Sequence, residues 1–205
     1  MSIVTKKEFP VDKGEAFWTT PDGPCIRISA NHTTIAVIGH ELLHLLLRVY
    51  GFANDFTGTE RTINNVTNLL QHHLIYPKYC ALGLPEKEFI NQTDRNKIIK
   101  FSKDLVRLGL QGQQDRRRLI GNCLVAASDF YFVPQDTRKS LVALIEASVH
   151  DVFNTAVGIY VQAALGPRDY VRASKAFMRL LGKDDNFMPG YVLGTAAPKP
   201  WPWSI

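Results

Sequence analysis

The segment Gly39–Phe52, GHELLHLLLRVYGF, constrains this chain most, because it sets three polar side chains in an otherwise apolar run. The apolar residues around it recur three and four positions apart, which predicts an amphipathic α-helix: Ile35, Ile38, Leu42, Leu45, Leu46 and Val49. His40, Glu41 and His44 fall within that helix. Burying two imidazoles and a carboxylate without strong partners costs several kcal/mol, so we expect them to form a site.

The spacing of these three residues is the pattern His-Glu-x-x-His, which six histidines in 205 residues would produce by chance only about 0.006 times. His40 and His44 are four apart and share one helix face, so both imidazoles can bind one ion at roughly 2.0–2.1 Å. Glu41 lies about 100° round the helix, within reach of a water beside that ion. The pattern therefore predicts a Zn²⁺ site with Glu41 as general base.

Two histidines leave a tetrahedral ion short of a protein ligand, and the segment NLLQHHLIYP offers the next candidates. Asn68, His72 and Tyr76 form a line at four-residue steps on a second predicted helix. We expect His72 to be the third ligand, Asn68 to orient a ligand and Tyr76 to assist the reacting oxygen. His73 continues the apolar stripe instead and is the packing alternative. Other candidates for the third ligand remain open: His73, Glu60, Cys80 and His150.

The rest of the chain predicts a hairpin over Ala16–Ser29, with a Pro-Asp-Gly-Pro turn before the alternating strand CIRIS, and then helices. Residues that could cap the first helix are Asn31, His32 and Thr33, and Gly51 is its stop. The further predicted helices are Thr59–Tyr76, closed by Pro77, and then Arg95–Leu110, Asp115–Phe132, Asp136–Leu165 and Tyr170–Leu181.

These elements predict an α+β fold that is mostly α, with a short amino-terminal β-hairpin or sheet packed on the metal helix and followed by a helical bundle. We expect one domain over residues 1–205. Its parts are the hairpin and metal-binding helices at 1–80, the bundle at 81–190 and an extended tail rich in proline and tryptophan at 191–205.

Composition excludes several classes of protein. The net charge of +5 is modest, and Arg116–Arg118 is the one dense basic cluster, so nucleic-acid binding is not favoured. Three widely spaced cysteines form no CxxC pair, which indicates a reducing, cytoplasmic environment. The amino terminus lacks a signal-peptide pattern and no apolar run is long enough for a membrane span, so we expect a soluble protein.

With HELLH followed by a ligand-bearing helix, the chain resembles the zincin superfamily of metallopeptidases over about residues 24 to 80. It is distantly similar to the compact bacterial ImmA/IrrE-type peptidases, which have a glutamate where this chain has Asn68, Gln71, His72 and His73. The resemblance implies zinc-dependent hydrolysis of a peptide or protein substrate. By its position before the metal helix, CIRIS also resembles the edge strand along which zincins lay an extended peptide, and a plain structural strand is the alternative.

Two alternatives follow from the same residues. His150 could donate to the developing oxyanion, or it could form a surface pair with Glu146 on one helix.

The leading hypothesis is a zinc metallopeptidase. Its rival is a non-catalytic helical binding or regulatory domain in which zinc joins two helices, as in a degenerate protease.

Overall fold

The structure is a computed structural model of the chain. It describes residues 2–6, 14–17, 25–29, 34–52, 56–57, 61–90, 96, 99–100, 103, 135–183, 185 and 188–189. For some of these residues the structure describes the side chain as well as the backbone. These residues are 80% helical, and only Ile26 and Ile28 among them lie in a strand. The predicted fold class is therefore wrong. Where side chains are described the structure is a small helical one, and the strands add only a three-stranded and a two-stranded sheet to it.

Helix α1, Ile35–Val49, carries the GHELLH segment. Its N-cap is Thr34, whose Oγ1 accepts a hydrogen bond from the Val37 N–H at 3.3 Å, so the cap lies just after the three predicted candidates. Gly51 follows with a φ of 88°, a left-handed conformation that glycine adopts without strain and that ends the helix. The predicted helix is confirmed almost residue for residue.

Helix α2, Arg61–Ala81, runs past the proline that was expected to end it. Pro77 lies inside the helix and is exposed, whereas Ile75, Tyr76 and Tyr79 around it are buried. A proline within a helix removes one backbone hydrogen bond and crowds the preceding turn. Burial of the neighbouring side chains offsets that cost, so the helix continues for another turn.

Two more helices complete the described helical part. Helix α5 is Gln135–Ala164 and α6 is Pro167–Leu180, both within a few residues of the predicted bounds. Pro167 begins α6, where its missing N–H costs nothing. A short 3₁₀ turn, η1, covers Glu86–Glu88. The helices predicted at 95–110 and 115–132, and the 191–205 tail, lie largely or wholly outside the described residues.

The described strands are short: β1 is Ser2–Lys6, β2 is Gly14–Phe17, β3 is Cys25–Ser29, β4 is Phe56–Thr57 and β5 is Met188–Pro189. β1 pairs parallel with β3, β2 pairs antiparallel with β3, and β4 pairs with β5. β3 is the CIRIS segment, and it is the central strand of the order β1-β3-β2. The expectation that CIRIS is a free edge strand for substrate is thus wrong, because its backbone is paired on both sides.

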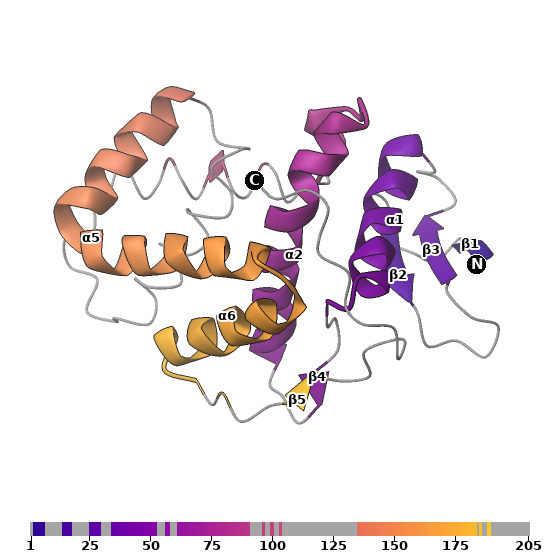
Figure 1. Ribbon diagram of the computed structural model, residues 1–205. Helices are drawn as coiled ribbons and strands as arrows, with labels where there is room; N and C mark the ends of the chain where they lie inside the picture. The colour runs from indigo at the N-terminus through magenta and orange to yellow at the C-terminus, as the bar shows by residue number, and fades with distance from the viewer. Residues whose placement is uncertain are drawn as a thin grey trace.

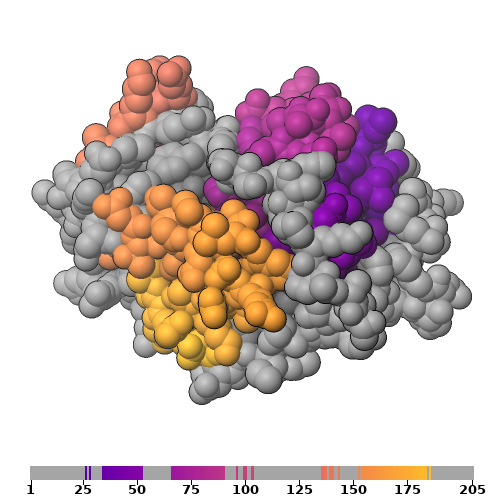
Figure 2. Space-filling view, viewed as in Figure 1, coloured from indigo at the N-terminus to yellow at the C-terminus, as the bar shows by residue number. Residues whose placement is uncertain are grey.

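The main core is built from helices. Helix α2 lies between α1 on one side and the pair α5 and α6 on the other (Figure 1). In the same view, Figure 2 shows the α5 and α6 surface in orange and yellow at one end of the molecule and the α1 surface in indigo at the other. The two strand residues with described side chains, Ile26 and Ile28, form a separate small cluster with Leu45. In the described part of the chain, no helix has the length and apolar character to cross a membrane.

Candidate metal centre

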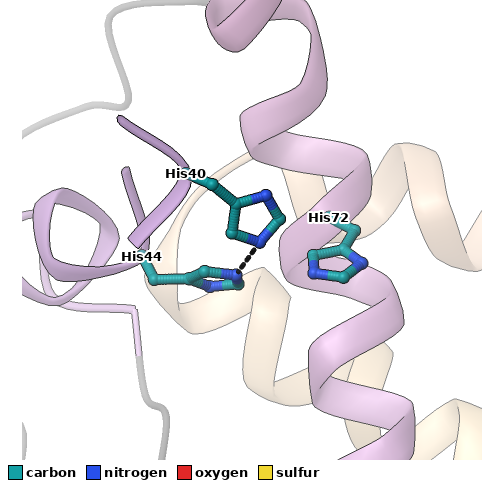
Figure 3. Close-up of side chains that lie close together, drawn as sticks. All are labelled: His40, His44 and His72. Atoms are coloured by element: carbon teal, nitrogen blue, oxygen red, sulfur yellow. Dashed lines mark hydrogen bonds between the residues drawn. The ribbon is translucent and has the colours of Figure 1, made fainter. Parts of the chain in front are cut away.

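Three histidines meet where α1 and α2 pack together. His40 and His44 project from α1 and His72 from α2, and the three imidazoles face one another (Figure 3). Nε2 of His40 and Nε2 of His44 are 3.0 Å apart, and the possible ligand atoms of all three residues lie within 4.8 Å of one another. The three residues are thus close enough to bind a metal ion. Among the described residues, no further His, Cys, Asp or Glu joins this group.

The local sequence explains why the helices approach so closely here. Gly39 precedes His40, and a Cβ atom at Gly39 would lie 2.5 Å from Cδ1 of Leu84, in the turn after α2. Glycine at this position therefore lets the Leu84 side chain lie directly against α1, and a larger residue would require that side chain to shift. Leu43 and Leu47 of α1 belong to the same buried cluster as Leu70 and Leu74 of α2, which holds the two helices together beside the histidines.

His44 is held by a hydrogen bond from the second helix. Its Nδ1 lies 2.7 Å from Oε1 of Gln71, which is buried on α2. An amide oxygen only accepts, so Nδ1 of His44 carries the proton, and its Nε2 presents a lone pair toward His40. Metal-binding histidines commonly donate their second ring N–H in this way, which fixes the ring orientation.

All three histidines are neutral at pH 7. Burial lowers the pKa of His44 to about 4, while the Gln71 hydrogen bond opposes the shift and Arg48 adds to it. Burial, followed by the charge on His44, lowers the pKa of His72 to about 3. For His40, burial and both other histidines hold the pKa well below 6.5, and the nearby Phe89 backbone opposes this. Neutral imidazoles are the form that binds a metal.

The dimensions of the group fit a tetrahedral ion after a small adjustment. Three nitrogens at about 2.05 Å from one ion would be about 3.3 Å apart. The His40 and His44 nitrogens are already 3.0 Å apart, so this pair needs to open by only about 0.3 Å. The widest pair, within 4.8 Å, needs to close by no more than about 1.5 Å, which a side-chain rotation supplies.

An aromatic wall covers one side of the histidines, and sequence reasoning missed it. Phe89 has 2% of its surface exposed, and its ring centroid lies 4.7 Å from that of His40 and 5.3 Å from that of His72. Tyr76 and Tyr79 each pack edge-on against Phe89 at 5.0 Å. Phe89 follows η1, outside any periodic helical pattern, so the sequence carried little signal for it. The wall keeps water away from that side of the site.

The other predicted site residues are placed as follows. Glu41 is buried on α1 next to His40, and it is not a member of the three-histidine group. Burial, and then hydrogen bonds to Glu86 and Cys80, raise the pKa of Tyr76, which places its hydroxyl toward those residues near the end of α2. Asn68 is exposed, and it is Gln71 that hydrogen-bonds to His44. His150 lies in α5, but its side chain is outside the described residues.

The competing candidates for the third ligand lie elsewhere. His73 packs against Tyr160 of α5, with ring centroids 5.1 Å apart, and so faces away from the group on the other side of α2. Burial lowers its pKa as well. Cys80 is exposed and is not a member of the group. Glu60 is outside the described residues. His72 is therefore the histidine that α2 brings to His40 and His44.

Comparison with known proteins adds no relative: no protein-family model, curated protein or solved structure matches this chain. Three neutral imidazoles on two packed helices can bind one divalent ion of the kind that prefers nitrogen ligands.

Proposed function

We propose that the protein is a zinc-dependent metallopeptidase in which His40, His44 and His72 bind zinc and Glu41 is the general base. One observation carries the proposal. His72 of α2 lies beside His40 and His44, the two histidines of the His-Glu-x-x-His segment on α1. Three protein ligands with room for a further one is the arrangement of catalytic zinc sites, whereas structural sites use four.

Zinc bound there would supply Lewis acidity, which polarises a carbonyl and lowers the pKa of water. The remaining chemistry belongs to the chain. Glu41 is buried one residue from His40. The role we assign to its carboxylate is to take a proton from the attacking water and deliver it to the leaving amine. Phe89 would restrict water on one side of the reacting groups, which strengthens each electrostatic interaction within the site.

Support for the zincin relationship rests on the motif and on its placement within a helix. HELLH lies in α1 with both histidines turned to one face, as that superfamily requires. The substrate class we propose, a peptide or protein, follows from this resemblance and from the general base beside the metal ligands.

A second candidate function is a non-catalytic helical domain stabilised by zinc. The observation that favours it is the burial of the group: His40 and His44 are buried, and Phe89, Tyr76 and Tyr79 pack around one another on one side. A metal enclosed by helices joins them whether or not it meets a substrate. The two functions differ in whether Glu41 is needed for anything beyond folding.

The test is to compare Glu41→Gln with the wild type and with Asp136→Asn, a matched change of carboxylate to amide at an exposed position on α5. For a metallopeptidase, the wild type and Asp136→Asn bind about one zinc per chain and hydrolyse a panel of unstructured proteins. Glu41→Gln should keep the zinc and lose at least about 100-fold in hydrolysis, as is typical for loss of a general base. Zinc binding with no hydrolysis by the wild type would support the structural role instead, and no zinc binding would refute both.

A further inference from the structure

We propose that Gln71 and Tyr170 are positioning residues of the metal centre, and that the backbone carbonyl of Thr67 fixes, through them, which nitrogen of His44 faces the metal. The inference deepens the proposed function, since it rests on metal binding by His44, but it does not depend on peptidase activity.

A chain of buried hydrogen bonds carries the argument. Nδ1 of His44 lies 2.7 Å from Oε1 of Gln71, the Gln71 side chain hydrogen-bonds to the hydroxyl of Tyr170, and that hydroxyl donates to the carbonyl oxygen of Thr67 at 3.1 Å. Gln71 and Thr67 are each 2% exposed and Tyr170 is 0% exposed. Water therefore has little access, and the protein itself must satisfy these polar groups.

The direction of every bond in this chain follows from its last member. A backbone carbonyl only accepts, so the single hydroxyl hydrogen of Tyr170 points to Thr67. The Tyr170 oxygen must then accept from Gln71, which turns the amide N–H₂ toward Tyr170 and leaves Oε1 facing His44. An amide oxygen cannot donate, so the proton of His44 lies on Nδ1.

Burial raises the pKa of Tyr170, and the hydrogen bond with Gln71 lowers it. If the amide were reversed, its oxygen would face the Tyr170 oxygen, and the hydroxyl would have to leave Thr67 to make any bond with Gln71. The Thr67 carbonyl would then lose its hydroxyl donor in a buried position, at a cost in free energy.

The consequence is that α6 helps to set the metal centre, although it contributes no ligand. Tyr170 lies on α6, Gln71 and Thr67 lie on α2, and His44 lies on α1. The series of hydrogen bonds therefore connects three helices. With Nδ1 protonated, the lone pair on Nε2 is directed at the group before any ion arrives. A ligand that needs no tautomer exchange or reorientation binds metal more tightly.

Three variants test the proposal, with Zn²⁺ alone as the probe and affinity measured by competition with a chelating dye. Gln71→Met keeps the side-chain volume but cannot accept from His44, and Tyr170→Phe keeps the ring but cannot orient the amide. Both should weaken zinc binding, Gln71→Met by about 10- to 100-fold and Tyr170→Phe by less. Gln71→Glu still accepts from His44 and should retain at least the affinity of the wild type.

The matched structural control is Ser174→Ala. Ser174 is also buried on α6, and its hydroxyl donates to the Tyr170 carbonyl oxygen at 2.9 Å, outside the chain that leads to His44. Its loss should lower the melting temperature, as the loss of any buried hydrogen bond does, and leave zinc affinity within about 2-fold of the wild type. A role of Gln71 or Tyr170 in folding alone would instead change stability and spare affinity.

Nitrogen NMR of ring-labelled histidine in the metal-free wild type provides a readout that needs no variant. We expect the Nδ1 of His44 to be protonated and its Nε2 to be unprotonated. An unprotonated Nδ1, or wild-type zinc affinity in Gln71→Met, would overturn the proposal while leaving the metal site intact. Failure of the wild type to bind zinc would overturn both this proposal and the proposed function.

Discussion

Acidification from pH 7 to pH 5 should strongly destabilise the metal-free protein, because its buried histidines resist protonation. The pKa values of His44 and His72 are about 4 and about 3 in the folded state, against 6.5 for an ordinary histidine. Between pH 6.5 and pH 4 the unfolded chain thus binds more protons than the folded chain. Stability is complete above pH 6.5 and is lost as the pH falls toward the folded pKa values.

The size of the effect follows from the same pKa values. At pH 5 the unfolded histidine is nearly fully protonated while the folded one stays neutral, which lowers the unfolding free energy by about 2 kcal/mol per histidine relative to pH 7. His44 and His72 together contribute about 4 kcal/mol, which is a large part of the 5–15 kcal/mol typical of a domain.

Urea denaturation of chelator-treated protein at the two pH values, followed by circular dichroism, measures this loss. The comparison variant is His72→Gln, which replaces one titrating ring with a neutral polar group and leaves every carboxylate unchanged. Its loss of stability between pH 7 and pH 5 should be about 2 kcal/mol smaller than that of the wild type. An equal loss in both proteins would show that His72 titrates normally in the folded state and would refute the reasoning.

Two further predictions concern residues of the three-histidine group and its surroundings. His72→Ala should abolish stoichiometric zinc binding, whereas the adjacent change His73→Ala should keep zinc and only weaken packing against Tyr160. Zinc titration and thermal denaturation separate the two effects, and loss of zinc binding in His73→Ala would contradict the assignment of His72 as the ligand. Phe89→Ala should lower the unfolding free energy by about 3–5 kcal/mol, because removal of a ring that is 2% exposed leaves a cavity. In urea denaturation, Phe89→Leu should lose much less of the unfolding free energy, and an unchanged stability in Phe89→Ala would show that the aromatic wall is not a packed element.

The three-histidine group could be anticipated from sequence, but its surroundings could not. A four-residue step brings His40 and His44 to one helix face, and the apolar stripe through Val66 and Leu70 separates His72 from His73. Gln71 is a neutral amide with no motif of its own, so only its 2.7 Å contact with His44 reveals its role. Phe89 reaches the histidines from a turn, where periodicity predicts nothing.

The fold was less accessible from sequence than the site. Local signals gave the bounds of α1, α5 and α6, because capping residues and prolines act on their immediate neighbours. Pro77 misled the prediction for α2, since burial of Ile75 and Tyr79 depends on distant partners that a local pattern does not contain. The partners of a strand are also distant in the sequence, so the alternating pattern of CIRIS could not show that this strand is the central one of its sheet. It also could not show that the main core is formed by helices.

X-ray absorption at the zinc edge of the zinc-loaded protein tests the central claim most directly, because it counts the imidazoles on the metal. We expect one zinc per chain with three imidazole ligands at about 2.0–2.1 Å, and two in His72→Ala if any ion is retained. A wild-type spectrum with fewer than three imidazoles, or one that is unchanged in His72→Ala, would contradict a metal centre built from His40, His44 and His72.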